Sequence, residues 1–157
     1  MRIIAHRGLT NGPDDLLQNH PLQVIKAIEQ GFDAEIDLWF DKGRWYLGHD
    51  TMSHEIPPAF LTNQHLWIHC KNLPAFYNLK RFGTKVNFFY HDSDKVVLTS
   101  NGNVWTYFGL PETMDPQAIC VMPEVTYSWT EIELMVRSGK WAGMCTDWPI
   151  RIRELLP

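Results

Sequence analysis

Residues 34–38 read Ala34-Glu35-Ile36-Asp37-Leu38, and this strictly alternating stretch decides how the rest of the chain is interpreted. Alternation with a period of two predicts a β-strand, because successive side chains on a strand point to opposite faces. Ala34, Ile36 and Leu38 then form an apolar face that suits packing against helices. Glu35 and Asp37 share the other face, where two neighbouring carboxylates are costly to bury. A divalent cation or a basic partner would remove that cost, and an acidic strand face in solvent is the alternative.

The composition of the whole chain narrows the class of protein. The 157 residues carry a formal net charge of −4 and include 45% hydrophobic residues, which predicts a single domain over residues 1–157. Scattered basic residues argue against nucleic-acid binding, which needs a basic face. No apolar stretch is long enough to span a bilayer, so no stable membrane insertion is expected. Cys70, Cys120 and Cys145 form no C-x-x-C pair and are interpreted as reduced core residues, which favours a cytoplasmic protein.

Strand and helix patterns alternate along the chain. Apolar spacing predicts helices over 17–30, 74–82 and 129–138 and a closing helical turn over 149–156. There are about eight strand candidates, and Asn101-Gly102 predicts a tight turn between two of them. This alternation favours an α/β fold with a largely parallel sheet. A (β/α)8 barrel has eight strands but typically takes about 250 residues, so the predicted fold is a reduced TIM-type barrel with some helices shortened or missing.

Two short motifs on either side of the acidic strand contain histidine. His6-Arg7-Gly8 ends the first predicted strand, and His49-Asp50 follows Gly48. Histidine suits proton transfer because its unperturbed pKa lies near 6.5. Arg7 offers a planar fork that matches phosphate oxygens. Taken alone, His6-Arg7-Gly8 is better explained by a hydrogen-bonded histidine at a strand end with an exposed arginine, and His49-Asp50 alone is a weak signal.

A third polar pair ends the predicted strand over 66–70. His69 and Lys71 share one face of that strand, with Cys70 opposite. His69 could complete a metal site with Glu35 and Asp37. Lys71 could neutralise a phosphate oxygen. A polar strand end that faces solvent is the alternative.

Later in the chain, Glu124 and Asp147 each lie just past a predicted strand. The carboxyl ends of strands are where barrel active sites are built. Both residues are therefore candidates for supporting a site, and a role at a helix start or in a loop is an equally good interpretation. His91-Asp92 also ends a strand and is a weaker candidate for lining the pocket.

Together the motifs resemble the glycerophosphodiester phosphodiesterase family, within the wider PLC-like phosphodiesterase barrels. The family pattern has His-Arg-Gly on the first strand, an Asn some residues on, Glu-x-Asp on the second strand and then His-Asp. The matching positions in this chain are His6-Arg7-Gly8, Asn19, Glu35-Ile36-Asp37 and His49-Asp50. The resemblance spans residues 3–50 and returns at Thr146-Asp147-Trp148-Pro149, which is similar to a last-strand Thr-Asp-x-Pro.

The resemblance implies a TIM-type barrel, a bound divalent metal and a role for each matched residue. His6 and His49 would be the acid and base, Glu35 and Asp37 would bind the metal, and Arg7 would contact the phosphate. Possible supporting residues around them are Asn19, Asp50, Glu124 and Asp147.

The chain departs from the family pattern in two places. The family usually carries Glu-x-Lys on the third strand, and this chain has His69-Cys70-Lys71. Mg²⁺ or Ca²⁺ is the expected cofactor, and His69 makes Mn²⁺ or Zn²⁺ possible because imidazole suits softer ions. The stretch 51–64 is too short to hold the family's substrate-capping insertion.

The sequence therefore predicts a metal-dependent phosphodiesterase that cleaves a glycerophosphodiester-like or related small phosphodiester. The nucleophile is either water or a substrate hydroxyl, and the second route passes through a cyclic phosphate. The alternative is a weak or inactive barrel that binds a phosphorylated polyol or phosphodiester. A third hypothesis is a purely structural domain, in which the histidines and carboxylates of the motifs do not converge.

Overall fold

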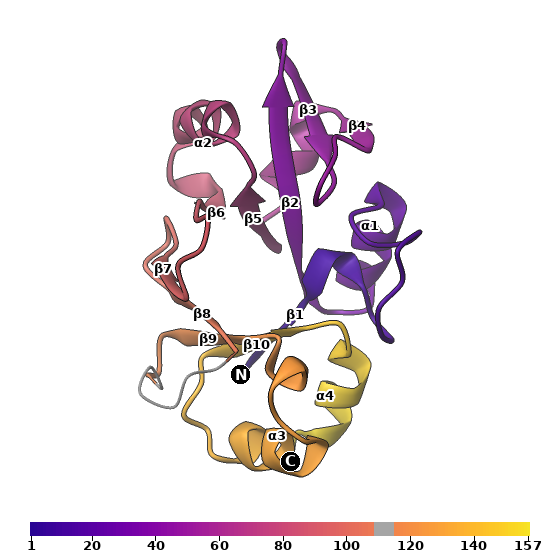
Figure 1. Ribbon diagram of the computed structural model, residues 1–157, viewed down its shortest axis with the longest axis vertical. Coiled ribbons are helices and arrows are strands. Elements are labelled where there is room, and N and C mark those ends of the chain that lie inside the picture. Colours follow the sequence, from indigo (N-terminus) through magenta and orange to yellow (C-terminus); the bar gives the residue numbers. More distant parts are fainter. Residues whose placement is uncertain (109–114) are drawn as a thin grey trace.

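One curled sheet runs through the protein. The computed structural model describes residues 1–108 and 115–157, and ten strands within them join into a single sheet (Figure 1). Its central strands are parallel to their neighbours. In spatial order they are β6 (Asn87–Phe89), β5 (Leu66–Cys70), β2 (Asp33–Asp41), β1 (Arg2–Ala5), β10 (Gly143–Thr146), β9 (Ala118–Val121) and β8 (Val104–Tyr107).

Three further strands extend the sheet through antiparallel pairs. β3 (Arg44–Leu47) pairs with the far half of β2, and β4 (His54–Ile56) pairs with β3. β7 (Val96–Leu98) pairs with β8 across the predicted Asn101-Gly102 turn, which confirms that hairpin. Gly102 has a φ of 83°, a value that glycine adopts without the steric cost borne by other residues.

Four short α-helices in the described part of the chain lie outside the curl (Figure 1). They are α1 (Pro21–Glu29), α2 (Leu73–Leu79), α3 (Trp129–Arg137) and α4 (Pro149–Leu155). Short 3-10 helices at His6–Gly8, Pro58–Thr62, Lys80–Lys85 and Pro123–Val125 fill several of the remaining connections. None of the described helices is both long and apolar enough to cross a membrane.

The predicted reduced TIM-type barrel is wrong. The described residues form a mixed α/β fold whose sheet curls into an open half-barrel, with four short helices rather than a helix after each strand. Hairpins at β2–β3 and β7–β8 take the place of two strand–helix–strand units. Backbone and side-chain hydrogen bonds join Phe88 to Ser100 at the gap, but no strand pairing connects β6 to β7 in the described part of the chain. A chain of this length is too short for eight complete units.

The predicted helix over 17–30 is shorter in the structure. α1 begins at Pro21, where the missing backbone N–H of proline costs nothing because the first turn has no acceptor for it. Residues 17–19 form a turn instead, and Asn19 adopts a left-handed conformation with φ 57°. This turn before α1 places the Asn19 side chain against the sheet.

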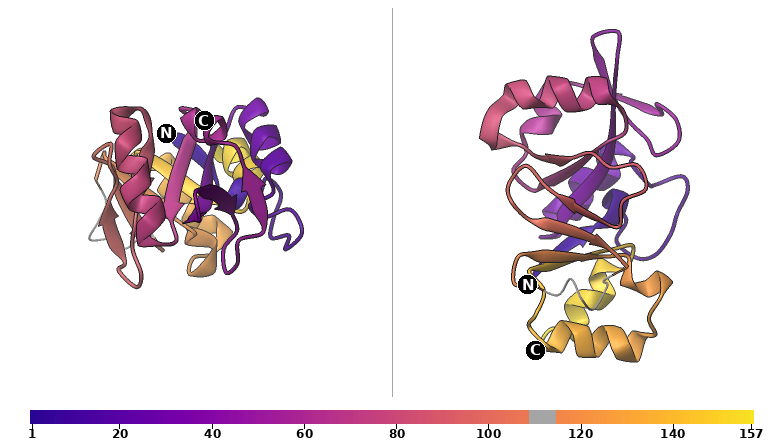
Figure 2. Two further views of the ribbon diagram at one scale, coloured as in Figure 1. Left: turned by 90° about the horizontal axis from the view of Figure 1, so that it is seen from above. Right: turned by 60° about the vertical axis from the view of Figure 1, so that its left-hand side comes forward.

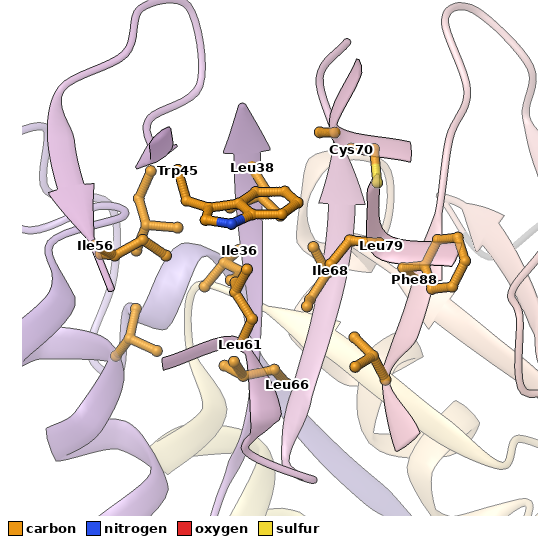
Figure 3. Close-up of a cluster of buried hydrophobic side chains, with 14 of the residues drawn as sticks. Ile36, Leu38, Trp45, Ile56, Leu61, Leu66, Ile68, Cys70, Leu79 and Phe88 are labelled. Atoms are coloured by element: carbon orange, nitrogen blue, oxygen red, sulfur yellow. The ribbon is translucent and has the colours of Figure 1, made fainter. Parts of the chain in front are cut away.

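The apolar core outside the curl forms on one face of the acidic strand, as its alternation predicts. Ile36 and Leu38 of β2 are fully buried together with Ile68 of β5. Figure 3 shows these side chains on the outer face of the sheet, enclosed by Trp45, Ile56, Leu61, Leu79 and Phe88. Burial of the even-numbered side chains leaves the odd-numbered ones, Glu35 and Asp37, on the concave face.

The concave face has a second apolar cluster of its own. Its members are Ile4, Trp67, Phe89, Trp105, Ile119, Val121 and Cys145, contributed by six different strands. Side chains from strands far apart in sequence meet there. They meet because the sheet curls, and the curl of the ribbon can be followed in the two views of Figure 2. This inner cluster is the floor beneath the candidate site.

Candidate functional site

On the concave face, apolar side chains give way to polar ones toward the carboxyl ends of the strands. Ile4, Trp67, Phe89, Trp105 and Cys145 belong to the inner apolar cluster. Two residues further along each chain segment, on the strand or just past its carboxyl end, come polar residues. In the same order these residues are His6, His69, His91, Tyr107 and Asp147.

Glu35, Asp37 and His69 form the centre of this polar layer. Each offers one ligand atom, and these atoms all lie within 4.8 Å of one another. The parallel register of β2 and β5 places Asp37 opposite His69. His69 Nδ1 lies 3.0 Å from Asp37 Oδ1 and must donate to it, because an ionised carboxylate only accepts. The residues that the sequence singled out for a metal site are thus brought together.

Two cationic side chains lie against Asp37 as well. Arg7 Nε lies 3.2 Å from Asp37 Oδ2, without the alignment of a hydrogen bond. Lys71 Nζ lies 3.6 Å from Asp37 Oδ1. Asn19 completes the surroundings, since its Nδ2 donates to Asp37 Oδ2 at 2.9 Å and its Oδ1 accepts from the Asp37 backbone N–H at 2.9 Å. Arg7, Asn19 and Lys71 therefore all lie beside Asp37.

The two carboxylates have opposite pKa shifts. Burial raises the pKa of Glu35, and the neighbouring Asp37 charge raises it further. Burial acts in the same direction on Asp37, but the hydrogen bond and charge of His69, with the charges of Arg7 and Lys71, hold the pKa of Asp37 well below its ordinary value. Asp37 is therefore the fixed negative charge of the site, and Glu35 is the carboxylate that most needs a cation.

Glu35 is held in place by the backbone of the first motif. Its Oε2 accepts from the Arg7 backbone N–H at 3.0 Å, and its side chain is almost fully buried. Arg7 adopts a left-handed conformation with φ 51°, which costs a residue with a side chain roughly 1–3 kcal/mol. That conformation aims the Arg7 N–H at Glu35, and the strain is offset by this bond and by the Asn19 N–H, which donates to Arg7 O at 2.8 Å.

His6 is part of a buried hydrogen-bond chain. Its Nδ1 lies 2.7 Å from Asp147 Oδ1. The Asp147 N–H and the Thr146 hydroxyl both donate to Glu124 Oε1, at 2.9 and 2.6 Å. Burial alone lowers the pKa of His6, but the hydrogen bond to Asp147 and the charge of Glu35 outweigh it, so the pKa is raised. Asp147 and Glu124 thus support His6, and the Thr146 link was missed from sequence.

His49 lies at the rim of the site. Its Nδ1 lies 2.8 Å from Asp50 Oδ1, and the Asp50 side chain is 88% exposed. Burial lowers the pKa of His49, although the charge of Asp37 opposes this. His49 also lines a cavity of about 350 Å³ together with His69 and Lys71.

The far wall of that cavity was largely missed from sequence. Of its residues, only His91 and Asp92 were weak candidates, and Ser93, Asp94, Lys95, Tyr107 and Phe108 were not considered. Tyr107 ends β8, so the strand-end rule that selected Glu124 and Asp147 could have found it. The His91 ring stacks on His69 with centroids 4.5 Å apart, and burial lowers the pKa of His91 to about 4.

The side chains present fit a divalent cation. Metal–ligand bonds of about 2.0–2.6 Å place two donors on one ion at most about 5 Å apart, and the three donors lie within 4.8 Å. Two carboxylates and one imidazole are donors that Mg²⁺, Ca²⁺, Mn²⁺ and Zn²⁺ accept to different degrees. The buried Glu35 carboxylate also gains most from such an ion, because burial is the leading cause of its raised pKa.

The site is therefore assembled from both ends of the chain, with polar side chains on β2 and β5 and just after β1 and β10, all at one end of the sheet. Its composition combines acidic, basic and imidazole groups around a shared centre. Compared with known proteins, the chain is matched by no protein-family model and by no curated protein.

Proposed function

We propose that this protein is a metal-dependent phosphodiesterase that cleaves a small-molecule phosphodiester. One observation carries the proposal, namely that Glu35, Asp37 and His69 place their ligand atoms within 4.8 Å of one another. Around this centre Arg7 and Lys71 supply positive charge beside Asp37. Cations next to a metal-ligand cluster suit a phosphate group that bears negative charge.

The roles of the chain's own residues follow from their surroundings. Glu35, Asp37 and His69 would hold the divalent ion, which when bound supplies Lewis-acid polarisation of the phosphoryl group. Asn19 keeps the Asp37 carboxylate in a fixed orientation through its two hydrogen bonds. Arg7 and Lys71 would offset the charge that develops on the phosphate oxygens during cleavage.

The two histidines differ in a way that supports separate roles. The pKa of His6 is raised because Asp147 and Glu35 outweigh burial, which favours the imidazolium form and a proton donor to the leaving alkoxide. The pKa of His49 is lowered mainly by burial, which favours neutral imidazole and a proton acceptor from water or a substrate hydroxyl. Asp147 is then a positioning residue for His6, and Asp50 for His49.

A second candidate function is binding of a phosphodiester or polyol phosphate without turnover. The observation that favours it is the completeness of the contacts around Asp37, which already has His69, Lys71, Arg7 and Asn19 within reach. A carboxylate that is neutralised by side chains has less need of a metal ion. In this second function, Arg7 and Lys71 would still supply positive charge to a bound phosphate.

The test is hydrolysis of a chromogenic phosphodiester in the presence of Mg²⁺, Ca²⁺ or Mn²⁺. Wild-type protein should show metal-stimulated hydrolysis, and His6→Ala should lose about 10²–10⁴-fold, the usual contribution of a general acid or base. The matched control is His65→Gln, since His65 bonds to Asp33 at the opposite end of the sheet and should leave the rate unchanged.

Calorimetric binding of Mn²⁺ to wild-type protein and to Glu35→Gln separates the two candidate functions. Metal binding with turnover supports the phosphodiesterase. A phosphodiester that binds but is not turned over with any of these metals supports the second candidate. An equal rate of phosphodiester hydrolysis in wild-type and His6→Ala protein would contradict the proposed mechanism.

A further inference from the structure

Of the two histidines proposed for proton transfer, His49 has the less firmly held side chain. Its Nδ1 lies 2.8 Å from Asp50 Oδ1, and the Asp50 side chain is 88% exposed. In the described part of the chain, neither of these two side chains has a further hydrogen bond. His6, in contrast, is held by the buried carboxylate of Asp147. The orientation of His49 therefore depends on the backbone that carries it.

Gly48, the residue before His49, is bonded to β2 through both of its backbone groups. Its N–H donates to the Asp37 backbone oxygen at 3.1 Å. Its C=O accepts from the indole Nε1–H of Trp39 at 2.6 Å, a short distance for an N–H···O bond. The peptide that joins Gly48 to His49 is therefore fixed by the side chain of Trp39.

The chain turns sharply just after this bond. Gly48 has a φ of 148°, a value that residues with a side chain rarely adopt, and a Cβ there would lie 2.0 Å from Thr51 O. The Ser53 N–H donates to Leu47 O at 2.9 Å and closes the turn before β4 begins. Because a peptide unit is planar, the orientation of the Gly48 carbonyl also sets the direction in which His49 leaves the strand.

The indole that fixes Gly48 is carried on a rigid part of the sheet. Trp39 lies on β2 opposite Tyr46 of β3, and β3 folds back beside the far half of β2 (Figure 1). At the other edge of β2, the Asn72 side chain bonds to the N–H and the C=O of Phe40, at 3.3 and 3.1 Å. The strand is thus held on both sides, which suits a side chain that positions another residue.

The location of Trp39 indicates support of His49 rather than contact with a ligand. Trp39 lies two residues beyond Asp37 on β2, so its side chain is on the same face as the two carboxylates. Among the described residues that line the cavity beside the centre, His49 is present and Trp39 is not. An indole has one polar hydrogen and no acceptor, and here that hydrogen is given to Gly48.

We propose that Trp39 is a positioning residue for His49, and that it acts by fixing the Gly48 carbonyl through its indole N–H. This inference rests on the proposed function for the role of His49 in proton transfer. A general base must lie within hydrogen-bond reach of the proton that it removes, and a misplacement of about 1 Å can cost on the order of 10²-fold in rate. The indole therefore affects the chemical step without touching the substrate.

The kinetic test is hydrolysis of bis-p-nitrophenyl phosphate with Mn²⁺ by Trp39→Phe, which keeps an aromatic ring and removes the N–H donor. Its kcat should fall about 10–100-fold with less than about a threefold change in KM, because the ligands of the centre are unchanged. Tyr46→Phe is the matched control, since Tyr46 is a half-buried aromatic residue opposite Trp39, and it should keep the wild-type kcat. Equal kcat in wild-type and Trp39→Phe protein would overturn the proposal.

A double-variant cycle shows whether Trp39 acts through His49. Residues that act as a unit give strongly non-additive losses of activity. In the His49→Ala background, Trp39→Phe should therefore lower kcat by less than about twofold. A further loss as large as the one in the wild-type background would mean that Trp39 acts independently of His49, against the proposal.

A second variant, Gly48→Ala, disturbs the same peptide and leaves Trp39 in place. Its added Cβ would meet Thr51 O, so the turn that begins at His49 has to shift. Gly48→Ala should reproduce the loss of kcat, again with less than about a twofold further effect in the His49→Ala background. A wild-type kcat in this variant would contradict the importance of the Gly48 carbonyl.

The mobility of the His49 ring gives a readout that needs no hydrolysis. Relaxation of ¹³C-labelled imidazole, measured by NMR, reports motion on the ps–ns timescale. The order parameter of His49 should fall in Trp39→Phe and stay at the wild-type value in Tyr46→Phe. The His6 ring, held by Asp147, should keep its order parameter in both variants, which verifies that they fold. An unchanged order parameter of His49 in Trp39→Phe would refute the positioning role.

These outcomes are distinguishable from those of the proposed function. A more mobile His49 ring in Trp39→Phe, with no phosphodiester hydrolysed by wild-type protein, keeps the positioning role and rejects the enzyme. Hydrolysis that depends on His49 but is unchanged in Trp39→Phe keeps the enzyme and rejects the positioning role.

Discussion

At the scale of single residues, Asp37 shows how this fold keeps a buried charge ionised. A carboxylate that is 1% exposed is unfavourable without compensation. Here the compensation comes from three different segments, through Arg7, Asn19 and the His69–Lys71 pair. The cations stabilise the charge, and the neutral amide of Asn19 orients it.

Asn19→Ala should destabilise the protein by about 2–3 kcal/mol, because it leaves the buried Asp37 N–H without an acceptor and removes a hydrogen bond to the buried Asp37 Oδ2. Asn19 also has φ 57°, so Asn19→Gly should be less destabilised than the alanine variant. Urea denaturation measures both. The control is Asn78→Ala on the exposed side of α2, whose Nδ2 donates to Pro74 O, and it should cost at most about 1 kcal/mol. Equal losses at both positions would contradict this account of Asn19.

The raised pKa of His6 predicts how the stability of the protein depends on pH. Its pKa is raised in the folded protein, because Asp147 and Glu35 outweigh burial. The stabilising effect of its charge is therefore fully present below the unfolded-state pKa of about 6.5, and it is lost as the pH rises through the folded-state pKa. The free energy of unfolding of wild-type protein, relative to His6→Gln, should accordingly fall as the pH is raised from about 6 upward. A difference that grows with pH would show that His6 is held neutral in the fold.

At the scale of elements, α3 is the helix whose start is most fully specified by its own sequence. The Ser128 side chain accepts from the Glu131 N–H, and the Glu131 side chain accepts from the Ser128 N–H, which makes a capping box. Two N–H groups that have no partner within the helix are thereby satisfied. The predicted helix over 129–138 is confirmed for this reason, and it ends at Arg137.

Ser128→Ala should therefore lower the free energy of unfolding by about 1 kcal/mol. Thr130→Ala is the matched control, since Thr130 is an exposed hydroxyl residue in the first turn of the same helix, and it should change stability by less than about 0.5 kcal/mol. Thermal unfolding followed by circular dichroism compares the two. A control that is destabilised as much as Ser128→Ala would mean that the cap adds nothing.

The long strand β2 connects the fold to the site. Its first residues pair with β1 and β5, and its last ones pair with β3. One face of the strand packs into the outer core, and the other carries Glu35 and Asp37. A one-residue slip in register would exchange these faces, so the buried apolar face fixes the position of the carboxylates.

At the scale of the whole molecule, the curl of the sheet brings the two ends of the chain together. β1 pairs with β10 from Arg2 to Ala5, and the two strands lie side by side in Figure 1. This pairing places Asp147 beside His6. The floor of the site is the inner apolar cluster, which strands from both halves of the chain share. The site therefore depends on the complete sheet.

This arrangement predicts that a bound metal stabilises the entire fold. Mn²⁺ at about 100 times its dissociation constant should add about 2.7 kcal/mol to the free energy of unfolding, and raise Tm by several degrees for a chain of this size. Asp37→Asn should abolish the increase, as measured by differential scanning calorimetry with and without EDTA. An identical increase in Asp37→Asn would locate the metal elsewhere.

What the sequence by itself determined is local. The alternation at 34–38 places Glu35 and Asp37 on one face, the Asn101-Gly102 turn specifies the β7–β8 hairpin, and the cap at Ser128 starts α3. Each of these depends on interactions between residues close in the chain, which recur wherever the same pattern occurs.

What only the tertiary structure decided is how the strands combine. The number of predicted strands suggested a TIM-type barrel. That number does not specify whether a helix or a hairpin connects two successive strands. In the structure the sheet stays open. The pairing of His6 with Asp147 joins residues 141 positions apart, and the wall at Tyr107 faces His91 from another strand. Such contacts follow from the packing of apolar side chains on both faces of the sheet, and no short stretch of sequence carries that information.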